Sequence, residues 1–217
     1  NAFNATMHEE VMTALEQIRR DEARALLLAG EGGGFSAGQD LADPEFPTGE
    51  GADLGGVLEH RYNPLVRQIK ELPLPVVAAV HGVAAGAGAD LALACDLVVA
   101  GRSARFVQAF ARLGLIPDAG GSFLLPHLVG LREAKRLAFT GEFFPAGEAA
   151  ELGLINEALP EDELDDEVDA LLDRLQDAPT RTVGLTKRAI HGNMARHWRD
   201  AMEYENNVQV QAYGTEE

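Results

Sequence analysis

The sequence is poor in cysteine and in long apolar runs. Its 217 residues include one cysteine, Cys95, so no disulfide can form within the chain. A chain without disulfides fits a reducing compartment, and we expect it to be cytoplasmic. No run approaches the roughly 18 apolar residues of a membrane-spanning helix, so no membrane partner is expected.

Positive charge is also scarce. The 18 Lys and Arg residues stand against 35 Asp and Glu residues, which gives a formal net charge of −17, and the lysines are limited to Lys70, Lys135 and Lys187. Nucleic acid is not an expected partner, because phosphate binding needs a basic patch and none is visible. An acidic, lysine-poor surface is typical of a halophilic protein, because concentrated salt screens the self-repulsion.

We expect the thermal unfolding midpoint to rise between low salt and molar KCl, because counterions screen the repulsion among the 35 acidic side chains. Calorimetry in a series of KCl concentrations measures this midpoint. A midpoint that stays constant across the series would identify an ordinary acidic protein and contradict the halophilic interpretation.

Helical and buried-strand patterns alternate along the first part of the chain. The expected helices cover 6–20, 57–72 and 86–95, and the expected strands cover 24–29, 75–80 and 96–100. Residues 42–56 mix Pro, Gly and acids without periodicity and indicate a surface loop. Alternation of strands and helices predicts an α/β fold with right-handed crossovers. From residue 120 the pattern is helical except near 154–158, so we expect an α/β core over 1–140 and a helical region over 141–217.

Two glycine-rich segments, 34–41 (GFSAGQDL) and 82–90 (GVAAGAGAD), each follow a predicted strand. Small residues let a ligand approach the backbone, and two such loops can aim main-chain N–H groups at one point. The second loop also opens a helix, whose N-terminal dipole favours developing negative charge. Neither loop has the G-x-G-x-x-G spacing of a dinucleotide site. Taken singly, either could be a tight turn that needs glycine for packing.

Several segments together resemble the crotonase (enoyl-CoA hydratase/isomerase) superfamily. Segments 35–41 and 79–88 are similar to the family's two oxyanion loops, and 1–4 is similar to the segment that follows its first strands. Segments 115–121 (LIPDAGG) and 149–155 (AAELGLI) are similar to two later signatures of the family. The likeness runs through the whole chain in the family's order. Within the superfamily, the sequence is most similar to the 1,2-epoxyphenylacetyl-CoA isomerases of phenylacetate degradation. The segments that carry this similarity are 38–41, 62–66, 83–89 and 114–118.

The resemblance implies a crotonase-like spiral of ββα units with a helical C-terminal region. It also implies assembly as a homotrimer or a dimer of trimers, and an acyl-CoA thioester as substrate. Coenzyme A is then part of the substrate, so no separate cofactor is expected, and the histidines show no metal-ligand spacing with Cys95 or the acids. The family's last helix is expected beyond Glu217.

The resemblance assigns the oxyanion hole to the backbone N–H groups of Gln39 and Ala87, although alanine at 87 departs from the family's glycine. Backbone donors are already oriented when an enolate oxygen forms, and losing one typically costs about 10²–10³ in rate. The residues implied to line the substrate site are Ala37, Gln39, Asp40, Leu41, Gly86, Ala87, Phe110, Leu115 and Pro117.

The acid/base residue is the open question. Family hydratases use two glutamates, but here Asp90 and Phe110 stand at those positions: phenylalanine cannot transfer a proton, and Asp90 is one methylene shorter. The paired site for adding water is therefore incomplete. Asp118 stands where family isomerases carry a catalytic aspartate, and one carboxylate can move a proton from one carbon to another. Burial against Phe110 and Leu115 would raise the pKa of Asp118 toward working pH.

Each carboxylate also has a structural interpretation. Asp118 could cap the helix that begins near Gly120, Asp90 could be a first-turn acid favoured by the helix dipole, and Asp40 could fix its loop. Two alternatives to an isomerase stay open: an enoyl-CoA hydratase that uses Asp90, and a noncatalytic or RNA-binding homologue. The acidic surface and the intact loops oppose the second.

Overall fold

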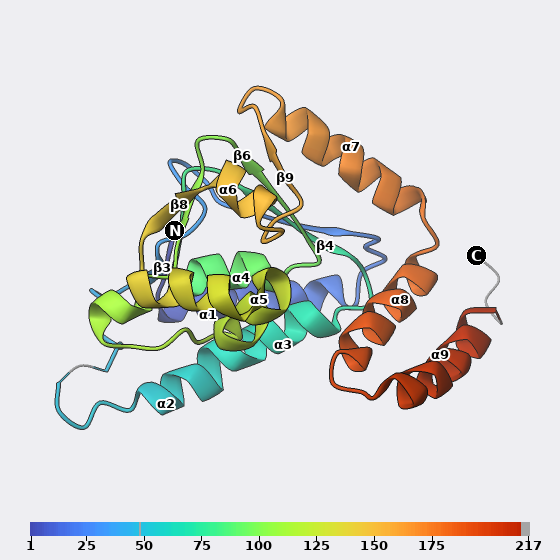
Figure 1. Ribbon diagram of the computed structural model, residues 1–217, viewed down its shortest axis with the longest axis horizontal. Helices are drawn as coiled ribbons and strands as arrows, with labels where there is room; N and C mark the ends of the chain where they lie inside the picture. Colours follow the sequence, from blue (N-terminus) through green and yellow to red (C-terminus); the bar gives the residue numbers. More distant parts are fainter. Residues whose placement is uncertain (48, 214–217) are drawn as a thin grey trace.

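The computed structural model describes residues 1–47 and 49–213, which form sheets, covering helices and a C-terminal set of helices (Figure 1). The strands are β1 (Ala2–Phe3), β2 (Leu26–Ala29), β3 (Gly38–Gln39), β4 (Val76–Val80), β5 (Val83–Ala85), β6 (Leu97–Gly101), β7 (Arg105–Val107), β8 (Phe143–Pro145) and β9 (Glu157–Leu159). The helices are α1 (Ala5–Ile18), α2 (Leu54–Val57), the π-helical η1 (Leu58–Tyr62), α3 (Asn63–Glu71), α4 (Ala87–Ala94), the 3₁₀-helical η2 (Ala109–Leu113), α5 (Gly121–Thr140), α6 (Ala146–Glu151), α7 (Leu164–Asp177), α8 (Thr180–Asn193) and α9 (Trp198–Tyr213). The expected α/β class is confirmed.

A four-stranded parallel sheet in the order β2-β4-β6-β9 forms the centre of the fold. All five residues of β4 are buried, because a parallel strand with both faces covered is a continuous apolar run. Val76, Ala78 and Val80 belong to the main core, whereas Ala79 packs with Leu164 of α7 in a separate cluster. The two-residue period of the strand thus places the main core on one face and α7 on the other.

Two smaller sheets carry the loops that follow the central strands. β1 pairs with β3, and β5 pairs in parallel with β7, which pairs antiparallel with β8. β8 joins this sheet and β9 joins the central one, although both lie beyond residue 140. The sheets therefore extend into the segment 141–217, and the purely helical part begins with α7 at Leu164.

The helix expected over 57–72 is three pieces, α2, η1 and α3, at whose centre the backbone makes a π turn. Asn63 N–H donates to the carbonyl oxygen of Leu58, five residues back, as a π turn requires. Pro64 follows at once and has no N–H to donate to the preceding turn. The helical spacing of apolar residues continues across the π turn. The sequence therefore predicts a helical segment here but not the change of helix type within it.

The C-terminal helices α8 and α9 lie beside the end of α3 (Figure 1). Lys187 fastens α8 to the core: its Nζ donates to the main-chain oxygens of Ile69 (2.8 Å) and Leu74 (3.2 Å) and pairs with Asp96 Oδ2 at 2.7 Å. This buried ammonium is held by three oxygens, as burial of a charge demands. Among residues 1–47 and 49–213, none of the helices has the length and apolar character needed to cross a membrane.

Candidate active site

The two glycine-rich loops lie against each other. Ser36 N–H donates to Val83 O (3.0 Å), and Ala85 N–H donates to Ser36 O (2.9 Å). Glycine permits this contact at two positions: a Cβ on Gly38 would lie 2.6 Å from Ala85 O, and one on Gly88 would lie 2.6 Å from Ser36 Oγ. Gly38 also has φ +80°, a conformation that other residues rarely adopt. The prediction that these two loops approach one another is confirmed.

A cavity of about 440 Å³ opens where the loops meet. Of the residues that the sequence predicted for the site, those that line it are Ala37, Gln39, Leu41, Gly86, Ala87, Phe110, Leu115, Pro117 and Asp118. Asp40 and Asp90 are not among its lining residues. Most of the other walls are apolar side chains from α2, η1 and the segment after η2, so the cavity suits an apolar acyl group with one polar end.

Gln39 and Ala87, one from each glycine-rich loop, both line this cavity. Ala87 begins α4, and the first N–H groups of a helix have no carbonyl partner within it. A Cβ on Gly38 would lie 3.3 Å from the nitrogen of Ala87, so the residue before Gln39 packs directly on that N–H. The structure therefore places both residues expected to supply the oxyanion donors at one cavity, with the positive end of the α4 dipole at Ala87.

Asp118 is the single carboxylate among the described residues that line the cavity. Burial raises the pKa of its side chain to about 6, and its Oδ1 is enclosed without a hydrogen-bond partner among the described residues. The expected alternative, an N-cap, is wrong: the cap of α5 is Gly120, and Asp118 contributes only its main-chain oxygen to Gly121 N–H (2.7 Å). Its side chain is therefore available to a ligand.

The turn that carries Asp118 is strained at the next residue. Ala119 has φ +47°, the one positive φ outside glycine among the described residues. A left-handed conformation costs an alanine about 1–2 kcal/mol. Ala119 is also buried, at 3% exposure, so packing holds the turn in this shape. Strain held by packing next to a cavity-lining carboxylate is typical of a functional position.

Tyr62 also lines the cavity, a position that the side-chain chemistry in the sequence did not predict. Its hydroxyl donates to Gln39 Oε1 (2.9 Å), and Gln39 Nε2 donates to the main-chain oxygen of Asp40 (3.0 Å). Burial, reinforced by the negative charge of Asp118, raises the pKa of Tyr62, so the phenol stays a donor. His8 packs edge-on against its ring at a centroid distance of 4.5 Å. In the sequence, only the similarity of 62–66 to the 1,2-epoxyphenylacetyl-CoA isomerases marks this position.

The whole chain, residues 1–217, matches the family described as enoyl-CoA hydratase/isomerase. The protein belongs to this family. The resemblance of the loops and of the 115–121 segment is thereby confirmed, and an acyl-CoA thioester is the substrate class consistent with enoyl-CoA hydratase/isomerase membership.

Known relatives carry both names of the enoyl-CoA hydratase/isomerase family. The chain is 49% identical to a 1,2-epoxyphenylacetyl-CoA isomerase of Escherichia coli over 88% of its length and 74% of that protein. It is 46% identical to a probable enoyl-CoA hydratase of Rhodobacter capsulatus over 90% of its length and 74% of that protein. The crystal structure of an enoyl-CoA hydratase from Bacillus anthracis superposes with a TM-score of 0.91 at 29% identity, covering 99% of this chain and 83% of that one.

Asp90 is sealed beneath the surface in this enoyl-CoA hydratase/isomerase family member. It is fully buried, its Oδ1 accepts a hydrogen bond from Gln108 Nε2 (2.7 Å), and burial raises its pKa well above the usual range. Gly121 lies directly over it: a Cβ there would be 2.2 Å from Asp90 Oδ2. Asp90 is in the first turn of α4, as expected. Its side chain faces Gln108 and Gly121, and its Oδ2 has no hydrogen-bond partner among the described residues, but Asp90 is not among the residues that line the cavity.

Asp40 was expected either to fix its loop or to line the substrate site, and its contacts are those of a residue that fixes the loop. Its Oδ1 accepts from Ala42 N–H (2.9 Å), and its own N–H donates to Phe3 O (2.9 Å). Asp40 therefore holds the loop that carries Gln39 rather than facing the cavity. No cluster of three His, Cys, Asp or Glu side chains able to hold a metal ion occurs within the described residues.

Proposed function

We propose that this family member is an acyl-CoA isomerase. The thioester oxygen accepts hydrogen bonds from the N–H groups of Gln39 and Ala87, and Asp118 moves the proton. The observation that carries this proposal is that one carboxylate, partly buried and with its pKa raised to about 6, stands in the same cavity as both N–H groups. Coenzyme A enters as part of the substrate, without a further cofactor.

The proposed step conserves all atoms. The Asp118 carboxylate removes a proton from a carbon alpha or gamma to the thioester, and the electron pair moves onto the carbonyl oxygen as an enolate. Preorganised N–H donors stabilise that oxygen anion. The protonated Asp118 then returns the proton to another carbon, so a double bond has moved and the mass is unchanged. Opening of an arene epoxide in a phenylacetyl thioester is the corresponding reaction suggested by the relative from Escherichia coli.

A hydratase is the second candidate, favoured by the name of the relative from Rhodobacter capsulatus. Adding water by the two-carboxylate route needs a second acid/base group in the cavity. Asp90 is the remaining carboxylate nearby, but it is fully buried and bonded to Gln108. The isomerase is therefore the better supported of the two. We also propose the trimeric or dimer-of-trimers assembly that the family resemblance implies.

Mass spectrometry of a thioester panel in high salt separates the two candidates. We expect the wild type to convert a 3-enoyl-CoA or an epoxyphenylacetyl-CoA without a change of mass, Asp118→Asn to lose this conversion, and Asp90→Asn to keep it. Gain of one water on crotonyl-CoA that survives in Asp118→Asn and disappears in Asp90→Asn would overturn the proposal. The thioester preferred by the wild type identifies the acyl group.

A further inference from the structure

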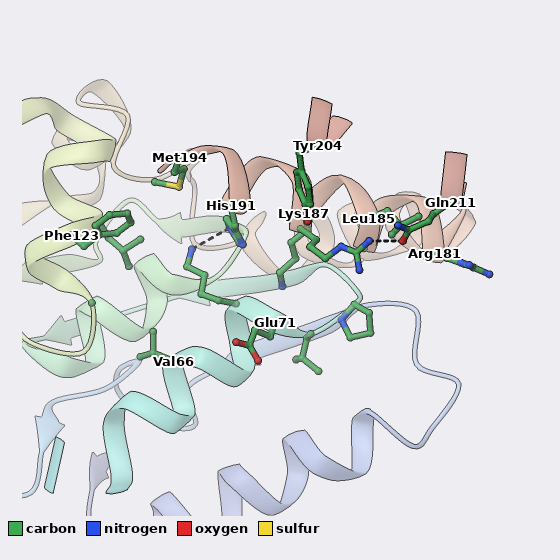
Figure 2. Close-up of a pocket in the computed structure, with 18 residues that line it drawn as sticks. Val66, Glu71, Phe123, Arg181, Leu185, Lys187, His191, Met194, Tyr204 and Gln211 are labelled. Atoms are coloured by element: carbon green, nitrogen blue, oxygen red, sulfur yellow. Dashed lines mark hydrogen bonds between the residues drawn. The ribbon is translucent and has the colours of Figure 1, made fainter. Parts of the chain in front are cut away.

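A second cavity, of about 770 Å³, lies between α3, α5 and the pair α8 and α9 (Figure 2). Gly120 borders both cavities, but the side chains that line this one belong to a different set of elements. Its volume is within the range of about 300–1,000 Å³ that small-molecule sites occupy. No step of the proposed isomerisation uses it.

Basic side chains gather in this cavity although the chain as a whole is strongly acidic. The basic residues that line it are Lys70, Arg181, Lys187, Arg188 and His191, and the one carboxylate among the described lining residues is Glu71. Two of the three lysines of the chain are therefore here, in a protein of net charge −17. Figure 2 shows Lys187 and His191 extending from α8 toward α3.

Lys187 and Arg188 already have partners. Lys187 is held by two carbonyl oxygens and by Asp96, as described above. Arg188 Nη2 donates to Gln211 Oε1 at 2.7 Å. Asp96 is itself committed, because its Oδ2 also accepts from Val76 N–H at 2.8 Å. These contacts belong to the docking of α8 and α9 and give both cations partners within the chain.

Lys70 differs from these two cations. Its one polar contact among the described residues is with His191 Nε2 at 3.5 Å, and no carboxylate of these residues lies within 4.0 Å of its Nζ. The charge of Asp96, whose Oδ1 lies 4.0 Å from His191 Nε2, acts on it from a greater distance. Burial lowers the pKa of Lys70, and burial together with the charge of Lys70 lowers the pKa of His191. The negative charge of Asp96 opposes both shifts, and the positive charge of Lys187 adds to them. An ammonium in such a site is stabilised by an anion that enters it.

The cavity lining also has an apolar part. It consists of Val66, Leu72, Pro73, Phe123, Leu124, Leu185 and Met194. A ligand that fills this space therefore needs an apolar body as well as an anionic end. Lys70 and Lys187 share one neighbouring carboxylate, Asp96, which leaves one net positive charge among these three groups. A single negative charge matches it, so a monoanion fits better than a phosphate dianion.

We propose that this second cavity binds a small amphipathic carboxylate, whose carboxylate contacts Lys70 Nζ and whose apolar body lies against the side chains of α3 and α5. The site is independent of the isomerase proposal, because it shares no side chain with the catalytic cavity. A medium-chain fatty acid or an aryl-alkyl carboxylate has the required chemistry.

Methionine NMR tests the site directly. The chain has four methionines, of which Met194 lines this cavity, while Met7 and Met12 pack on the main core and Met202 lies on α9 outside the lining set. The full chain carrying [¹³C-methyl]methionine is titrated with octanoate while butyryl-CoA fills the catalytic cavity. We expect the Met194 signal to shift in a saturable manner and the Met7 and Met12 signals to stay in place.

Two lysine variants and one neutral ligand decide the role of charge. Lys70→Gln is expected to weaken octanoate binding by roughly 10- to 100-fold, the range for loss of a hydrogen bond to a charged group. Lys135→Gln makes the same charge change at an exposed position of α5 and is expected to have no effect. Octanol is expected to bind as weakly to the wild type as octanoate binds to Lys70→Gln. Thermal unfolding of each variant confirms that it is folded.

Several results would overturn the proposal. One is the absence of a Met194 shift at millimolar octanoate, and another is equal affinity for octanol and octanoate, which would mean an apolar cavity without anion recognition. A third is equal weakening by Lys70→Gln and Lys135→Gln, which would reflect net charge alone. Failure of the thioester panel would leave each of these readouts unchanged, so the two proposals are tested separately.

Discussion

Replacing Asp118 by Asn lowers the turnover of thioester isomerisation by roughly 10²–10⁴-fold in our expectation, the usual contribution of a positioned acid/base group. The amide has nearly the same shape, so the cavity and the turn at Ala119 are preserved. KM should change little, because in the proposed mechanism main-chain N–H groups hold the thioester oxygen. Steady-state kinetics on the thioester preferred by the wild type measures kcat and KM separately.

The pH dependence of the wild type provides the second signature of Asp118. In the proposed mechanism this side chain must be ionised to remove a proton, and burial raises its pKa to about 6. kcat/KM, which reports the free enzyme, should therefore be constant above this pKa and fall about tenfold for each pH unit below it. Any residual kcat/KM of the Asn variant should not show this fall at low pH.

Asp90→Asn is the matched control for Asp118→Asn. It makes the same chemical change at a carboxylate that is fully buried and bonded to Gln108. Since burial already favours the protonated form of Asp90, removing its ionisation should leave kcat within about tenfold of the wild type, well short of the loss expected of an acid/base group. A loss at Asp90→Asn as large as that at Asp118→Asn would show that both carboxylates act in the reaction, as a hydratase requires.

The central strands and the first helix could be predicted from local pattern. The apolar run at 75–80 becomes β4 (Val76–Val80), and the period at 6–20 becomes α1 (Ala5–Ile18). β5, β7 and β8 have three residues each, too few to display a period, and they were missed. β7 and β8 exist because their backbones pair with each other, a contact that no local pattern records.

The candidate site was predicted from family spacing rather than from physical chemistry alone. The local sequence does not distinguish Asp118 from Asp90, because both are aspartates near the start of a helix. Their difference is tertiary, because the glycine at 121 lies over one carboxylate while the strained Ala119 turns the other toward the cavity. The second cavity was not predicted at all, since Lys70 and His191 are 121 residues apart and meet only when α8 docks on α3.

Gly38→Ala is the second substitution with a large expected effect. Its methyl group would lie 2.6 Å from Ala85 O and 3.3 Å from the nitrogen of Ala87, so the two loops must separate. Because the proposed donors lie on these two loops, we expect kcat/KM to fall by about 10²–10³-fold, the loss associated with one oxyanion donor. Asp118 keeps its pKa in this variant, so the acidic limb of the pH profile should stay near pH 6.

Gly32→Ala separates the collision from backbone strain. Gly32 has φ +78°, almost the same as the +80° of Gly38, but a Cβ there meets nothing within 4 Å. Both alanine variants therefore carry the strain of a positive φ, and only Gly38→Ala pushes the loops apart. We expect a similar lowering of the unfolding midpoint in both and a loss of kcat/KM in Gly38→Ala alone. Equal activity in the two variants would mean that the close approach of the loops at Ala87 has no part in catalysis, and the oxyanion hole would have to lie elsewhere.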